Sequence, residues 1–225
     1  MILKVDNLYK EINHNGILKI KNKKEKIDDY LNHMEDRRMG LALLIRPSKQ
    51  IQRKITEIVR VIQKIEPDQY FYKNYQHHIT LLDFTTARQD FKYSKEQIKI
   101  YTAITESVLK NIKKFKIHCK GLIVSNDAIL VKGFYENIMN QIREELRNKM
   151  KENNLKNDER YKTMSSHITI ARFKEPLKNR DKLLETLKMY EQYEFGEFYV
   201  SNIEFVYHNW YDSKRELIRN YCLGD

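Results

Sequence analysis

A four-residue motif that occurs twice constrains the fold of this chain more than any other feature. His78-Ile79-Thr80-Leu81 returns as His167-Ile168-Thr169-Ile170, and a phenylalanine (Phe84 or Phe173) follows each histidine at the same offset. Side chains alternate between the two faces of a β-strand, so the histidine and the threonine of each copy would share one face. The pattern predicts two strands, each of which buries an aliphatic row and presents an imidazole and a hydroxyl.

The sequence around these motifs predicts alternating strands and helices from Gly40 onward. Short apolar runs indicate buried strands, and isoleucines or leucines at helical spacing indicate helices. The expected order is strand 41–45, helix 49–65, strand 70–84, helix 101–112, hairpin 114–134, helix 138–146, strand 165–173, helix 183–187 and strands 198–200 and 205–207. This order is typical of an α+β fold. We expect two pseudo-symmetric lobes, each with an antiparallel sheet, flanking helices and one motif, and a central groove between the sheets.

Residues 1–38 differ from the rest of the chain in composition. They include the runs 19–26 and 35–38, which are almost entirely charged, and they have few paired apolar positions. We expect a charged N-terminal extension that packs loosely, followed by a single bilobal domain at 39–225. A basic arm that binds nucleic acid is the alternative for this segment.

Composition narrows the class of protein and its partners. The net charge of +11 favours a polyanion such as RNA or a nucleotide, although a chain rich in Lys, Asn and Ile also gains lysines without a functional reason. No run approaches the roughly 18 uncharged apolar residues of a membrane span. Asp6 interrupts the apolar start that a signal peptide needs, and the two cysteines fit no disulfide or metal pattern. We expect a cytoplasmic protein with no membrane partner, reduced cysteines and, by default, a monomeric state.

Two imidazoles and two hydroxyls in one groove are the groups that metal-free cleavage of a phosphodiester requires. One neutral histidine removes a proton from the attacking oxygen, and one protonated histidine gives a proton to the leaving oxygen. We expect His78 and His167 to form this catalytic pair, and Thr80 and Thr169 to donate to the non-bridging oxygens, where charge builds up. No cofactor or metal is expected, because no carboxylate or thiol repeats beside the motifs; a zinc site that adds His208 is the weaker alternative.

Other residues are candidates for substrate binding. Alternation places Arg172 on the strand face opposite His167, although its long side chain could curl to the groove rim and contact a phosphate. His208 could border the groove, whereas His77 should point away from it as a packing or exposed residue. Aromatic rings that could stack on a base, or simply fill space, are Tyr75, Tyr161 and Trp210.

The paired motifs resemble those of the 2H phosphoesterase superfamily, which includes the RNA 2′,3′-cyclic phosphodiesterases that are often called 2′-5′ RNA ligases. The resemblance covers Gly40 to the C-terminus and is most specific at 167–172, which is similar to the family's H-x-T-hydrophobic-A-R form. It implies a groove on a pseudo-twofold axis, no metal requirement, and an RNA or nucleotide substrate with a 2′,3′-cyclic, 2′-5′ or 3′-5′ linkage; some members open cyclic oligonucleotide signals. The chain departs from the pattern in its extension and in Asp83, where the second copy has Arg172.

The leading hypothesis is therefore a hydrolase, a metal-independent phosphodiesterase that acts on a ribose-linked phosphodiester in RNA or a cyclic nucleotide. A non-catalytic module that binds RNA or nucleotides is one alternative, and it would bind without turnover. An RNA 2′-5′ ligase is the other, and it would join RNA ends.

Overall fold

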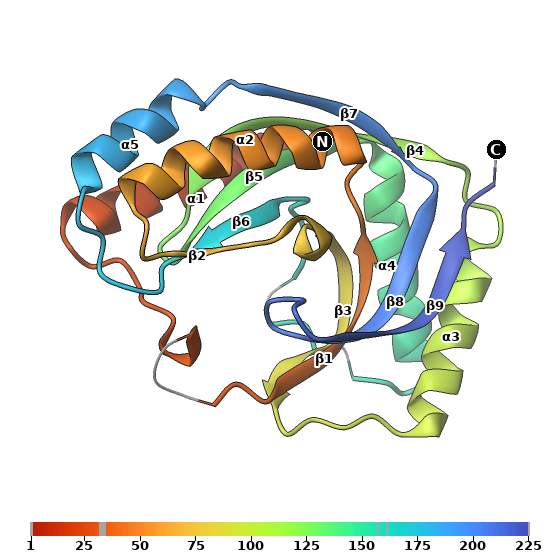
Figure 1. Ribbon diagram of the computed structural model, residues 1–225. Helices are drawn as coiled ribbons and strands as arrows, with labels where there is room; N and C mark the ends of the chain where they lie inside the picture. Colours follow the sequence, from red (N-terminus) through yellow and green to blue (C-terminus); the bar gives the residue numbers. More distant parts are fainter. Residues whose placement is uncertain (1, 32–34, 157, 161, 225) are drawn as a thin grey trace.

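Two antiparallel sheets and the helices that cover them make up the computed structural model, which describes residues 2–31, 35–156, 158–160 and 162–224 (Figure 1). Sheet A has the strand order β3-β1-β8-β9, and sheet B has the order β2-β6-β5-β4-β7. The strands of sheet A are β1 (Arg38–Ile45), β3 (Ile79–Gln89), β8 (Asn202–Asn209) and β9 (Arg215–Cys222).

Sheet B takes its strands mainly from the middle of the chain. They are β2 (Tyr70–Phe71), β4 (Phe115–Val124), β5 (Ala128–Tyr135), β6 (Ile168–Arg172) and β7 (Glu194–Val200). Sheet A, in contrast, pairs the early strand β1 with the late strand β8. Each lobe carries one histidine motif, but neither lobe is a continuous half of the sequence.

Five α-helices in the described residues flank the sheets. They are α1 (Ile2–Lys21), α2 (Lys49–Ile65), α3 (Lys95–Leu109), α4 (Asn137–Glu152) and α5 (Arg180–Met189). Helix α2 and helix α5 contact strands of sheet B, and α3 and α4 contact strands of sheet A and each other. Helix α2 illustrates how the sequence sets the bounds and the buried face of a helix. The Ser48 side chain caps its first turn, and the helix ends before Pro67. Its stripe of isoleucines is buried.

Helix α1 is bound to the body more tightly than its charge suggests. Val5, Tyr9 and Ile20 are buried along its length. Gly16 lies directly on the β4–β5 turn, where an added Cβ would fall 2.2 Å from the Val124 carbonyl oxygen. The expectation of loose packing is therefore wrong for this helix, because a few well-spaced apolar residues dock it despite the surrounding lysines. The division of the chain at residue 38 stays a prediction.

The predicted α+β, two-lobed architecture with antiparallel sheets is confirmed. The strand expected at 70–84 is divided into β2 and β3 by a 3-10 turn, η2 (Asn74–Gln76), and the final strand β9 is one that the sequence pattern does not predict. None of the helices in the described part of the chain is both long and apolar enough to cross a membrane.

Candidate active site

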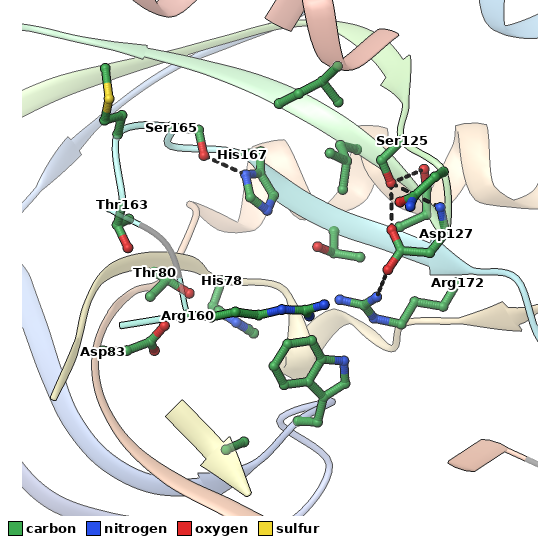
Figure 2. Close-up of a pocket in the computed structure, with 18 of the residues that line it drawn as sticks. His78, Thr80, Asp83, Ser125, Asp127, Arg160, Thr163, Ser165, His167 and Arg172 are labelled. Carbon is green, nitrogen blue, oxygen red and sulfur yellow. Dashed lines mark hydrogen bonds and ion pairs between the residues drawn. The ribbon is translucent and has the colours of Figure 1, made fainter. Parts of the chain in front are cut away.

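Both histidine motifs open into one cavity between the sheets. His78 lies just before β3 and His167 just before β6, and Thr80 and Thr169 follow on the same strand faces. All four side chains line a cavity of about 610 Å³. Figure 2 labels three of them, His78, Thr80 and His167. The aliphatic partners of the motifs are fully buried on the opposite faces; they are Ile79, Leu81, Ile168 and Ile170.

The Nδ1 atom of each motif histidine is engaged by the protein, two residues back along the chain. In His78 it lies 2.7 Å from the carbonyl oxygen of Gln76, and in His167 it lies 2.8 Å from the Ser165 hydroxyl. A carbonyl only accepts, so Nδ1 of His78 carries a hydrogen and the neutral ring has an unprotonated Nε2. A hydroxyl donates or accepts, so His167 can adopt either tautomer. In both rings Nε2 is the atom left for a substrate.

Burial strongly disfavours the charged form of both histidines. It lowers the pKa of His78 to about 3 and the pKa of His167 to about 4. The positive charges of Arg172 and Arg143 lower the pKa of His167 further, whereas the carboxylate of Asp212 acts against the lowering at His78. Both rings are therefore neutral at pH 7 in the free protein. An anion held between them would favour the imidazolium form and raise both pKa values.

A one-residue register shift in each motif strand brings a further residue into the groove. The pairing of β3 with β1 shifts at Leu81, and the pairing of β6 with β5 shifts at Ile170. An extra residue of this kind reverses the alternation of side chains beyond it. Asp83 and Arg172, each five residues after its histidine, consequently line the same cavity as the histidines. The expectation that Arg172 faces away from His167 is wrong for this reason.

Arg172 is held in place by three neighbours. Its Nε donates to the Tyr72 hydroxyl at 3.0 Å and its Nη1 to Asp127 at 3.0 Å, and its guanidinium lies 5.2 Å from the centre of the Trp210 ring. Trp210 also lines the cavity and has the guanidinium of Arg160 at 5.5 Å. This end of the groove therefore presents cationic groups around one indole.

The buried carboxylate of Asp212 lies next to two histidines of the cavity, His78 and His208. His208 lines the cavity with its ring 5.9 Å from that of His78, and its Nδ1 lies 3.0 Å from Asp212. Asp212 is fully buried and also accepts from Arg46 at 2.5 Å and from Arg215 at 3.2 Å. Burial alone would raise the pKa of Asp212, but the hydrogen bond from His208 and the charges nearby outweigh burial and hold it well below its ordinary range. Because a carboxylate only accepts, His208 keeps a hydrogen on Nδ1, and the neutral form of its ring has an unprotonated Nε2.

The remaining sequence candidates lie elsewhere. Tyr75 is half exposed and is not among the residues that line the cavity, and its carbonyl accepts from Arg215. Tyr161 lies outside the described residues. His77 is buried and is not among the residues that line the cavity. Across the residues that the structure describes, no group of three or more His, Cys, Asp or Glu side chains is arranged to hold a metal ion.

Two antiparallel sheets that bring paired His-x-Thr motifs into a shared groove define the bilobal fold of the 2H phosphoesterases. The model of one family within this class, described as the 2′-5′ RNA ligase superfamily, matches residues 47–211. The chain belongs to that superfamily.

Solved structures share the fold at low sequence identity. The TT0787 protein of Thermus thermophilus is 16% identical, with a TM-score of 0.59 over 83% of this chain and 99% of that one. E. coli LigT complexed with 3′-AMP is 12% identical, with a TM-score of 0.58 over 85% and 100%. A protein of unknown function from Agrobacterium tumefaciens strain C58, ATU0111, is 12% identical, with a TM-score of 0.51 over 88% and 98%. No curated protein matches the chain.

Proposed function

We propose that the protein is a metal-independent phosphodiesterase that uses His78 and His167 as general acid and base on a ribose-linked phosphodiester. One observation carries this proposal: two imidazoles from different sheets share one cavity, and each has Nδ1 engaged by the protein and Nε2 available. Thr80 and Thr169 supply hydroxyls beside them. A phosphate placed between the rings would meet a base, an acid and two donors.

In this mechanism, one neutral imidazole takes the proton of the attacking oxygen as the new P–O bond forms. The two threonine hydroxyls donate to the non-bridging oxygens, where negative charge increases. The other imidazole, protonated, gives its proton to the ribose oxygen as the old P–O bond breaks. With water as the attacking group and a 2′,3′-cyclic phosphate as substrate, the product is a 2′- or 3′-phosphomonoester, and the histidines return to their starting states by exchanging protons with solvent.

The substrate itself would help to prepare the acid. Both motif histidines are neutral in the free protein, so the imidazolium must form when the anion binds. A phosphate beside a buried ring favours its charged form. Arg172, held by Asp127 and Tyr72, would contribute a fixed positive charge to the same phosphate.

Relatives favour a nucleotide as the substrate class. E. coli LigT, which shares the fold, has been solved in complexes with 3′-AMP and with ATP. The cationic end of the groove around Trp210 suits such an anionic, aromatic ligand.

An RNA 2′-5′ ligase is the second candidate, because the matching family is described by that activity. Ligation would run the same chemistry in reverse, with a ribose hydroxyl as the attacking group on a cyclic phosphate. A protein that binds RNA or nucleotides without turnover is the third candidate. Product analysis separates the three: a shorter or opened product, a joined product, or none.

The test is incubation in EDTA with 2′,3′-cyclic nucleotides, 2′-5′ oligonucleotides and cyclic dinucleotides, with products identified by mass. We expect cleavage by the wild type and a fall in kcat of at least about 100-fold in His78→Ala and in His167→Ala. His118→Ala is the matched control, because His118 is a surface residue paired with Glu194. Wild-type rates in either motif variant would refute the mechanism.

A further inference from the structure

The two motif strands place opposite charges at equivalent positions of the groove. Asp83 follows His78, and Arg172 follows His167, by the same five residues and after the same kind of register shift. Figure 2 shows Asp83 beside Thr80, with Arg172 at the other end of the cavity. The pseudo-symmetry of the lobes therefore does not extend to charge, and the two ends of the groove cannot bind the same chemical group.

Asp83 and His208 line the same cavity from two strands that flank β1. On β1, Ala42 pairs with Asp83 on one side and with Val206 on the other, and Gly40 pairs with His208. Paired residues share a sheet face, so Asp83 and His208 stand on the groove face of sheet A on either side of β1. A group bound in this part of the cavity can therefore meet both side chains.

Both of these side chains offer acceptors. The hydrogen bond to Asp212 places a hydrogen on Nδ1 of His208, so the neutral form of the ring carries its lone pair on Nε2. Burial raises the pKa of Asp83 to about 6, with smaller contributions of the same sign from Glu159 and Asp158 and an opposing one from the charged form of His208. Asp83 is thus a carboxylate at pH 8. At its own position, Asp83 therefore favours a hydrogen-bond donor and opposes an anion.

We propose that Asp83 and His208 form an acceptor subsite for a hydroxyl or amino group of the substrate's nucleoside, and that Asp83 excludes a second phosphate from this end of the groove. This inference rests on the proposed function, in which the phosphodiester lies between His78 and His167. It specifies the substrate class as a nucleotide with one phosphodiester at the histidines and an unphosphorylated sugar or base toward sheet A. A nucleoside 2′,3′-cyclic phosphate with a free 5′-hydroxyl fits, and its 5′-phosphorylated counterpart does not.

The Asp83 carboxylate should bind a ligand with a hydroxyl at this position more tightly than one with a phosphate there. A hydroxyl that donates to a carboxylate makes a charge-assisted hydrogen bond, roughly twice as strong as a neutral one. A phosphate in its place would set two like charges a few ångströms apart inside a cavity that screens them poorly. The extra phosphate should therefore weaken binding even though the protein's net charge of +11 would attract it.

Binding of two products tests this inference without any turnover. Calorimetric titration at pH 8 in EDTA compares adenosine 3′-monophosphate with adenosine 3′,5′-bisphosphate. We expect the wild type to bind the monophosphate at least about tenfold more tightly, and Asp83→Asn to reduce this preference to within about twofold while also weakening monophosphate binding. Asp90→Asn, which removes a carboxylate from an exposed pair with Arg37, is the matched control and should keep the wild-type preference.

Equal or tighter binding of the bisphosphate by the wild type would overturn the inference, and this comparison needs no variant to fold. A preference that survives Asp83→Asn, or failure of both nucleotides to bind, would overturn it as well. A protein that shows the expected preference but cleaves none of the phosphodiesters would refute the proposed phosphodiesterase and leave the acceptor subsite standing.

Discussion

An anion that binds between the motif histidines should draw protons from solution. His78 and His167 are neutral in the free protein because burial lowers their pKa values to about 3 and about 4. Sulfate is a suitable probe, since it resembles a phosphate in shape and keeps its charge constant between pH 5 and 8. If sulfate sits where the substrate phosphate would sit, it must raise both pKa values.

The expected number of protons follows from the protonated fraction of each ring without and with sulfate. At pH 6, a ring with a pKa of about 4 is protonated about 1% of the time. If sulfate restores only the ordinary value of 6.5, the same ring is protonated about 75% of the time. Each ring therefore takes up roughly 0.75 of a proton, and the pair roughly 1.5.

The assay is calorimetric titration with sulfate at pH 6 in buffers of different ionisation enthalpy, because the slope of observed heat against that enthalpy counts the protons taken up. His167→Asn should lower the count by roughly 0.75, and His118→Asn, which removes a surface histidine, should leave it unchanged. Asp83 titrates in the same range, but its contribution is common to all three proteins. A count near zero in the wild type, or an unchanged count in His167→Asn, would refute the proposed place of the anion between the rings.

Three further predictions concern stability and reactivity. The pKa values of His77, His78 and His167 are lowered to about 4, 3 and 4, so the unfolded chain binds protons that the folded protein rejects. The free energy of unfolding should therefore be at its full value above pH 6.5 and fall as the pH drops toward 4, and a urea midpoint that stays flat from pH 7 to pH 5 would contradict this. Tyr9→Phe should lower the free energy of unfolding by about 1–3 kcal/mol, because the buried Tyr9 hydroxyl donates to the Gly133 carbonyl oxygen and accepts from the Ser166 amide. Tyr199→Phe, at an exposed position, is the control. Equal urea midpoints for the two variants would disprove the reasoning. A thiol reagent at pH 8 should modify only Cys222 in the native protein and both cysteines in denaturant, because Cys119 is buried and its pKa is raised to about 12. Rapid labelling of two thiols in the native protein would contradict the burial of Cys119 on β4.

The sequence predicts that the histidine and the threonine of each motif share a strand face, and this prediction holds for a physical reason. The alternation rule applies from each histidine to its threonine, since the register shifts come after both, at Leu81 and Ile170. Beyond the shifts the rule reverses, and for this reason it assigns Arg172 to the wrong face. A bulge leaves no composition signal in a single sequence, so only the strand pairing reveals it.

Two other features escape prediction because they depend on distant partners. Asp212 follows His208 by four residues in a turn, and nothing local indicates that Arg46, from the end of β1, will neutralise it. Composition predicts loose packing for helix α1 because charge dominates it, whereas three buried side chains decide how the helix packs. In both cases the decisive energy comes from contacts across the fold rather than from neighbours in sequence.

The position of β1 in sheet A has a consequence during synthesis on the ribosome. Its final neighbours are β3, which follows soon after, and β8, which begins at Asn202. From the completion of β1 at Ile45 until β8 emerges, one edge of a strand with six consecutive buried residues has no native partner. At roughly 5–20 residues per second this interval lasts roughly 8–30 s. The nascent chain must therefore keep an apolar strand edge from pairing with other chains for most of its translation, and overproduction in cells with little free chaperone should yield aggregates nucleated by β1.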